Sequence, residues 1–215
     1  MNSKRKYFGL DQLDRIIAEH IPATTGTFVE LGAFDGQKQN NSLYFERLGW
    51  RGILIEPNPE SAALCRKNRP LAKVFECACI ASDDPRTEVE LITCGLMTIV
   101  NGARGDAAAE EKWISRGEQV QSIQRGTAIV KARTLQSILD EAEIKHVDLF
   151  ILDVEGFEIS VLKGLDFHRN APAWIVVEDN YVDDVSNHLL ALNYKREALL
   201  LKRQFTRDVL YKFQG

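Results

Sequence analysis

Short apolar runs alternate with amphipathic stretches along most of the chain. The apolar runs lie at 27–31, 52–56, 73–80, 147–152 and 173–178, and most are followed by the periodicity of an amphipathic helix. The predicted helices include 43–48, 60–67, 157–165 and 185–190. Buried strands that alternate with helices are typical of a parallel sheet covered on both faces. The pattern therefore predicts a doubly wound α/β domain.

Two segments depart from this alternation. Residues 194–201 and 208–213 have the pattern of two strands joined by a polar turn, which predicts an antiparallel hairpin at the end of a mostly parallel sheet. Residues 93–126 contain five glycines and an alanine-rich helical piece at 106–113. Ligands bind at the carboxyl edge of open α/β sheets, and long loops there are usually functional. We therefore predict one domain over 1–215, in which 93–126 is an insertion that acts as a lid.

Composition and charge limit the partners. The length of 215 residues and the hydrophobic content of 45% are enough for one substantial core. The net charge of −4 gives no electrostatic reason to expect nucleic acid, and the basic runs at 4–6 and 202–203 are short. No apolar run approaches the roughly 18 residues of a membrane span, and none follows the N-terminal charges as in a secretory signal. These features predict a cytoplasmic protein that binds neither nucleic acid nor membrane.

The four cysteines give no sign of metal or redox chemistry. None forms a C-x-x-C pair. Cys77 and Cys79 alternate along the predicted strand 73–80, so they share one face and are expected to pack in the core. A reactive thiol is the alternative interpretation.

The first candidate ligand site is a strand that runs into two glycines, at 28–36. Gly32 and Gly36 allow the backbone to approach a ligand closely and to adopt a positive φ. Glu30 and Asp35 can accept hydrogen bonds from a ligand amine. The same motif also fits a tight strand-to-loop turn that binds nothing.

A second acidic position narrows the choice of ligand. Glu56 follows the second predicted strand, 20 residues beyond Gly36. An acidic residue at this place binds the ribose hydroxyls of an adenosine-containing ligand, and NAD would satisfy it. However, the first loop lacks G-x-G-x-x-G and does not lead directly into a helix that could receive a pyrophosphate. These features favour a ligand with adenosine and no pyrophosphate, and S-adenosylmethionine is such a ligand.

Several blocks, in the same order, resemble the FkbM family of methyltransferases. The blocks are 28–36, 40–46, 48–50, 52–59, 134–139 and 148–158. The resemblance implies a seven-stranded, Rossmann-like class I methyltransferase sheet and methyl transfer to oxygen, often on sugars or polyketide-like natural products. Where the family commonly has Ser-Asn-Thr, this chain has Asn40-Asn41-Ser42, so Asn41 keeps the central cofactor position while the flanking hydroxyls differ. The implied cofactor-binding residues are Glu30, Gly32, Ala33, Phe34, Asp35, Gly36, Asn41, Glu56, Pro57 and Asp153.

Acidic residues cluster where the fourth and fifth predicted strands end. Asp153, Glu155 and Glu158 follow the fourth strand, where they would also be favourable as charges at a helix N-terminus. Glu178 and Asp179 end the fifth strand, which lies beside the fourth in a doubly wound sheet. A carboxylate at this edge can orient the acceptor or accept its proton. We take Asp153, Glu178 and Asp179 as the catalytic candidates.

A divalent metal is an alternative use of the same edge. Asp153, Asp179 and Asn180 offer hard oxygen ligands suited to Mg²⁺ or Ca²⁺. Metal-dependent catechol O-methyltransferases carry a similar arrangement, although an Asp-Asn pair before a helix is also an ordinary capping sequence. Of the two hypotheses we favour a site without metal, in which Asp153 or a nearby carboxylate takes the proton.

Together these observations predict an S-adenosylmethionine-dependent methyltransferase that acts on a hydroxyl group of a small acceptor. A non-catalytic cofactor-binding module would keep the loop at 28–36 and Glu56, but it would not need the acidic cluster. A nicotinamide-dependent oxidoreductase is a third interpretation.

Overall fold

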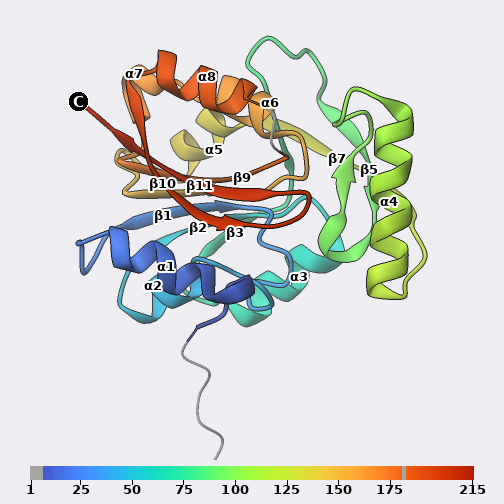
Figure 1. Ribbon diagram of the computed structural model, residues 1–215, viewed down its shortest axis with the longest axis horizontal. Helices are drawn as coiled ribbons and strands as arrows, with labels where there is room; N and C mark the ends of the chain where they lie inside the picture. Colours follow the sequence, from blue (N-terminus) through green and yellow to red (C-terminus); the bar gives the residue numbers. More distant parts are fainter. Residues whose placement is uncertain (1–6, 181–182) are drawn as a thin grey trace, which may run out of the picture.

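A computed structural model describes residues 7–180 and 183–215 (Figure 1). Its main element is a seven-stranded sheet with the order β10-β11-β9-β8-β1-β2-β3. The strands are β1 (Thr27–Leu31), β2 (Arg51–Ile55), β3 (Lys73–Phe75), β8 (Leu149–Leu152), β9 (Trp174–Asp179), β10 (Tyr194–Lys202) and β11 (Arg207–Phe213). Neighbouring strands are parallel from β3 to β9, whereas β11 runs antiparallel to both β9 and β10. The doubly wound sheet and its terminal hairpin are thus confirmed.

Helices cover both faces of the main sheet (Figure 1). One face carries α1 (Leu13–His20), preceded by the 3-10 turn η1 (Leu10–Gln12), α2 (Leu43–Arg47) and α3 (Pro59–Asn68). The other face carries α5 (Leu135–Glu141), α6 (Glu158–Lys163), α7 (Phe167–Asn170) and α8 (Asp184–Ala191). Each face has its own apolar core, because successive strand residues point to opposite sides of the sheet. Cys77 and Cys79 are buried in the core beneath α5 and α6, as predicted.

The predicted strand 73–80 is wrong in one respect, because it is broken in the middle. Its first part forms β3, but the chain leaves the main sheet at Glu76 and Cys77. The second part forms β4 (Ala78–Ile80), which pairs with β7 (Gly126–Thr134) in a second sheet. This four-stranded sheet has the order β4-β7-β5-β6, with β5 at Glu88–Thr93 and β6 at Ile99–Val100.

The segment 93–126 is folded against this small sheet. It contains the 3-10 turn η2 (Gly95–Met97), β6 and helix α4 (Ala107–Gln121), which is longer than the helical piece predicted at 106–113. In Figure 1 the small sheet and α4 stand beside the end of the main sheet to which the C-terminal hairpin turn points. The action of the segment as a lid remains a prediction.

The structure bears only in part on the predictions about location and partners. The basic run at 4–6 lies outside the described residues. Across 7–180 and 183–215, every helix falls short of the length and apolarity that a bilayer crossing requires.

Candidate cofactor and acceptor site

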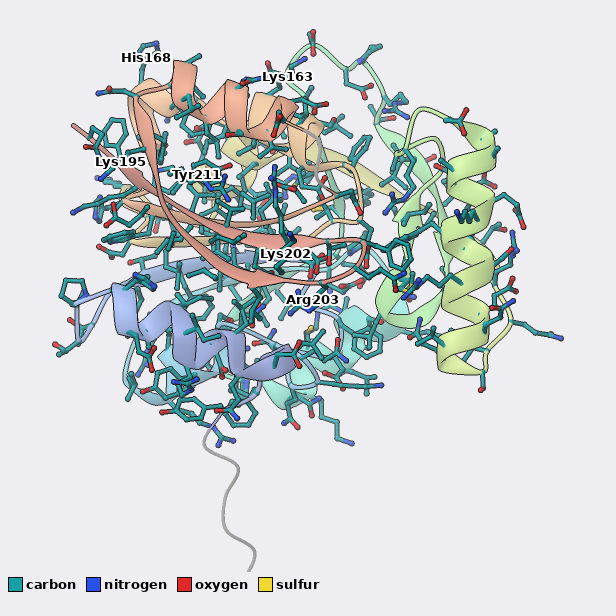
Figure 2. All side chains as sticks on the ribbon, in the orientation of Figure 1. Lys163, His168, Lys195, Lys202, Arg203 and Tyr211 are labelled. Carbon is teal, nitrogen blue, oxygen red and sulfur yellow. The ribbon has the colours of Figure 1, made fainter. Side chains whose placement is uncertain are left out.

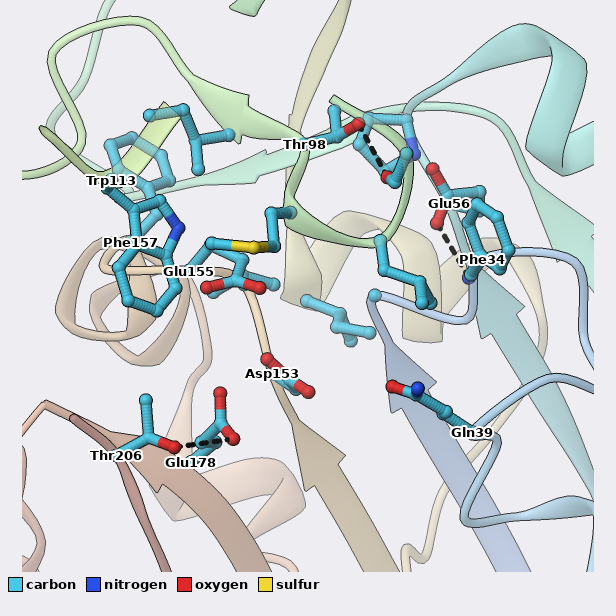
Figure 3. Close-up of a pocket in the computed structure, with 18 of the residues that line it drawn as sticks. Phe34, Gln39, Glu56, Thr98, Trp113, Asp153, Glu155, Phe157, Glu178 and Thr206 are labelled. Carbon is cyan, nitrogen blue, oxygen red and sulfur yellow. Dashed lines mark hydrogen bonds between the residues drawn. The ribbon is translucent and has the colours of Figure 1, made fainter. Parts of the chain in front are cut away.

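A cavity of about 450 Å³ lies at the carboxyl ends of β1, β2, β8 and β9 (Figure 3). The main sheet contributes the backbone around Gly32 and the side chains of Glu56, Asp153 and Glu178. The small sheet, η2 and α4 contribute an apolar wall, and the turn of the C-terminal hairpin contributes Thr206 and its neighbours. The sheet edge at which ligands bind in doubly wound folds is therefore enclosed on several sides.

Glu56 holds the first loop in place at one end of the cavity. Its side chain is only 5% exposed and accepts hydrogen bonds of 2.9 Å from the backbone N–H groups of Phe34 and Asn58. Burial raises the pKa of Glu56 to about 7, although both hydrogen bonds oppose this shift. Each carboxylate oxygen has a second lone pair, so Glu56 can also accept bonds from a ribose diol.

Gly32 is required by the close approach of two chain segments. Its φ is +78°, and a Cβ there would lie 1.9 Å from the carbonyl oxygen of Asp153. The sequence predicted that glycine lets the backbone approach a ligand, and Gly32 does line the cavity. The structure adds a packing reason, because only glycine lets the ends of β1 and β8 meet in this way.

Glu30 faces the loop after β1 and does not line the cavity. Its buried carboxylate accepts hydrogen bonds from Asn40 Nδ2 at 2.7 Å, Asn41 N–H at 2.9 Å and the Ser42 hydroxyl at 2.5 Å. Asn41 itself lines the cavity, and among the described residues its buried Oδ1 has no hydrogen-bond partner. Glu30 therefore positions the loop, and it holds Asn41 where this residue lines the cavity.

The other predicted cofactor residues also fall into two groups, those that hold the loop together and those that line the cavity. Asp35 accepts bonds of 2.8 and 2.7 Å from the N–H groups of Gln37 and Lys38, which fixes the turn. Ala33 is buried, and its carbonyl accepts from the N–H of Gly36 at 2.9 Å. The predicted cofactor residues that line the cavity are Gly32, Phe34, Asn41, Glu56, Pro57 and Asp153.

Arg69 holds the loop after β1 by hydrogen bonds from its side chain. The sequence did not predict this role. Its fully buried guanidinium donates to Glu46 at 3.0 Å, to the Gly36 carbonyl at 3.2 Å and to Asn40 Oδ1 at 2.8 Å. It also donates to Ser42 at 3.0 Å. An arginine near the end of α3 gives no sequence signal of this role, because its partners become neighbours only in the folded chain.

Three carboxylates meet at the other end of the cavity. Oxygen atoms of Asp153, Glu155 and Glu178 lie within 4.8 Å of one another. Burial, then the charges of Glu178 and Glu155, raises the pKa of Asp153 well above its ordinary value. Burial also raises the pKa of Glu178, whereas the charge of Arg203, then the hydroxyl of Thr206 and the neighbouring Asp153, lower it. The state in which Asp153 and Glu178 carry one proton between them is therefore favoured over the state in which both are ionised.

Glu155 is part of this group but has a strained backbone. Its φ is +58°, which is uncommon for a residue with a Cβ. Burial and the charges of Glu178 and Glu158 raise its pKa, and Arg104 and the indole of Trp113 oppose this shift. Figure 3 shows Glu155 beside Trp113 and Phe157, while Asp153 lies between Glu178 and the side of the cavity that carries Glu56. The sequence did not predict Trp113 or Thr206 at this site.

The structure corrects the place of Asp179 and Asn180. Asp179 is buried and forms an ion pair with Arg207 at 2.7 Å, and neither Asp179 nor Asn180 lines the cavity. The physical reason is the alternation of β9, which directs Glu178 and Asp179 to opposite faces of the sheet. Asn180 instead accepts a hydrogen bond from Arg104 at 3.3 Å. The predicted metal set of Asp153, Asp179 and Asn180 therefore does not converge.

The carboxylates that do converge do not fit a resident divalent ion. The guanidinium of Arg203 lies 3.3 Å from Glu178 Oε1 and the Thr206 hydroxyl donates to the same oxygen, so this oxygen already has two partners. Burial and the neighbouring carboxylates raise the pKa of Asp153 and so favour its protonated form, whereas a metal ligand must be an ionised carboxylate. We therefore assign no role to a metal.

The seven-stranded sheet and the cavity at its carboxyl edge define a class I methyltransferase. Residues 30–197 match the Methyltransferase FkbM domain, and the chain belongs to this family of S-adenosylmethionine-dependent methyltransferases. The resemblance seen in the sequence is confirmed.

Solved structures show the same fold at low sequence identity. The ribosomal protein L11 methylase from Lactobacillus delbrueckii subsp. bulgaricus is 11% identical, with a TM-score of 0.54 over 95% of this chain and 78% of that one. The precorrin-6y C5,15-methyltransferase from Geobacter metallireducens GS-15 is 10% identical, with a TM-score of 0.51 over 100% and 94%. The putative methyltransferase yhhF from Escherichia coli is 13% identical, with a TM-score of 0.50 over 96% and 88%. Comparison with curated proteins gives no match.

Proposed function

We propose that the protein transfers the methyl group of S-adenosylmethionine to a hydroxyl group of a small acceptor. The observation that carries this proposal is the pair of Asp153 and Glu178, whose carboxylate oxygens lie within 4.8 Å of each other in the cavity that Glu56 also lines. A hydroxyl that attacks a methyl group must lose its proton, and a carboxylate pair that holds one proton can take up another. The sulfonium supplies an already activated methyl group, so the protein mainly orients the reactants and removes this proton.

The two ends of the cavity suit different parts of the cofactor. Glu56 binds the ribose diol, and Pro57 and Phe34 line the cavity beside it. Gly32, Asn41 and Asp153 face the methionine part. The acidic end is favourable for a positively charged sulfonium.

The size and charge of the cavity favour a small acceptor. About 450 Å³ must hold the cofactor and the reacting part of the acceptor together. The net charge of −4 and the acidic end are unfavourable for a nucleic acid phosphate backbone. A sugar or other natural product with a free hydroxyl, of the kind implied by the family, meets both conditions.

Incubation of the purified protein with cell extract and methyl-labelled S-adenosylmethionine tests the proposal. Mass spectrometry should find label in an ether-linked methyl group of a small compound, and heat-inactivated protein is the control. A protein that binds the cofactor but labels no compound would be a binding module. A nicotinamide oxidoreductase would instead be stabilised by NAD, since a ligand at a hundred times its Kd adds roughly 2.7 kcal/mol.

Glu56→Ala should weaken the binding of S-adenosylhomocysteine by about 1.5–3 kcal/mol, because a charged hydrogen-bond partner of the ribose is lost. The affinity of the unaltered protein should rise as the pH increases through about 7, where Glu56 becomes ionised. Isothermal titration calorimetry at several pH values measures both effects. Glu60→Ala, four residues further on and exposed, is the matched control and should bind normally. Unchanged affinity in Glu56→Ala would remove Glu56 from the cofactor site.

A further inference from the structure

The turn of the C-terminal hairpin reaches the acidic end of the cavity. Residues 203–206 connect β10 to β11, and all four line the cavity. Figure 2 shows Arg203 at the end of the hairpin that lies nearer α4, far from Lys195 at the other end. The match to the FkbM domain ends at residue 197, so this turn lies beyond the part of the chain that the family defines.

Arg203 connects three acidic residues from different parts of the chain. Its guanidinium donates to Glu178 at 3.3 Å and to Asp11 at 3.2 Å, and it also binds Asp208. Thr206 donates its hydroxyl to the same oxygen of Glu178 at 3.0 Å. Glu178 and Asp208 are paired across β9 and β11, so one side chain holds both. The turn therefore fixes the position of Glu178 from the side opposite to Asp153.

We propose that Arg203 is a positioning residue that makes Glu178, rather than Asp153, the carboxylate that accepts the proton of the acceptor. This inference rests on the proposed function. As the acceptor oxygen forms its bond to the methyl carbon, the C–S bond breaks and its electrons stay on sulfur. The hydroxyl proton passes to Glu178 and then to solvent. Asp153 stays protonated and donates its hydrogen bond to Glu178.

The charges around Glu178 explain why one arginine has this effect. The groups that face it are Asp153, Glu155 and Glu158 from the segment after β8, Asp208 and Arg203 from the hairpin, and Arg104 from the segment before α4. Burial and Glu178 raise the pKa of Asp208 to about 7, and Arg203 opposes this shift. Four carboxylates thus face Glu178, and Arg203 is the cation in direct contact with it. Without Arg203, an ionised Glu178 would be strongly disfavoured.

Carboxyl ¹³C NMR of the whole protein tests the order of titration without an acceptor. In the unaltered protein Glu178 should ionise at lower pH than Asp153, with Glu178→Gln and Asp153→Asn used to assign the signals. In Arg203→Gln the pKa of Glu178 should rise by about 1–3 units, the usual effect of losing an adjacent opposite charge. Arg203→Lys should restore most of the shift. Thr206→Val, which removes only a hydrogen bond, should cause a smaller rise.

Arg207→Gln is the matched control, because Arg207 holds Asp179 on the other face of β9. It should leave the titration of Glu178 unchanged even where it lowers stability. An unchanged Glu178 titration in Arg203→Gln, or an Asp153 that ionises first in the unaltered protein, would overturn the inference.

With an acceptor available, the acid limb of kcat/KM against pH should move upward by the same amount in Arg203→Gln, while the affinity for S-adenosylhomocysteine stays constant. A fixed acid limb would also overturn the inference. Methyl transfer by the unaltered protein is measured separately, so a failure of the proposed function is distinguishable from a failure of this assignment.

Discussion

Glu178→Gln should lower kcat by about 10²–10⁴-fold, the usual contribution of general base catalysis. Glutamine keeps the shape of the side chain and can still bind Thr206, but it cannot accept the proton of the acceptor. The affinity for S-adenosylhomocysteine should stay the same, because Glu56 and the loop after β1 are not altered. Single-turnover methyl transfer and calorimetry separate these two effects.

Asp179→Asn is the control for this substitution. Asp179 lies on the same strand as Glu178, but its ion-pair partner is Arg207 and its side chain does not line the cavity. Turnover should therefore be kept, although loss of the ion pair lowers stability. A Glu178→Gln protein with normal kcat would place the base elsewhere. Loss of wild-type turnover in EDTA, with recovery in Mg²⁺, would instead show that a metal lowers the pKa of the acceptor.

The sequence predicted those parts of the site that depend on strand order. Each parallel strand ends at the same edge of the sheet, so the positions of Glu56, Asp153 and Glu178 follow from the strands that precede them. The C-terminal hairpin was also predictable, because its two strands are adjacent in the chain and joined by a short turn.

What the sequence did not predict depends on contacts between distant segments. The break at Glu76 and Cys77 has no glycine or proline to mark it, and it is caused by the pairing of β4 with β7, far along the chain. The wrong placement of Asp179 came from treating adjacent residues as though they faced one cavity. Successive side chains of a strand point to opposite faces of the sheet, so Glu178 and Asp179 cannot both face the cavity. Arg203 and Thr206 reach the site only because β11 pairs antiparallel with β9, which brings the hairpin turn to the carboxyl end of β9.

Arg69→Met should lower the free energy of unfolding by about 3–5 kcal/mol, the usual cost of breaking a buried ion pair by removing one partner. Arg69 and Glu46 are only 0% and 8% exposed, so Glu46 would be left as an unpaired buried charge. The Gly36 carbonyl and Asn40 would lose their donor as well. Urea unfolding followed by circular dichroism measures the loss.

A surface ion pair between α3 and the residue after β3 provides the comparison. Arg66 and Glu76 are 47% and 38% exposed, so Arg66→Met should cost no more than about 1 kcal/mol. The buried pair also has a functional consequence, because Arg69 opposes the rise in the pKa of Glu30, whose ionised carboxylate holds Asn41 at the cavity. Arg69→Met should therefore weaken S-adenosylhomocysteine binding under conditions in which the protein is still folded, whereas Arg66→Met should not. Equal losses of stability in the two variants would contradict the role of Arg69 as the anchor of the loop after β1.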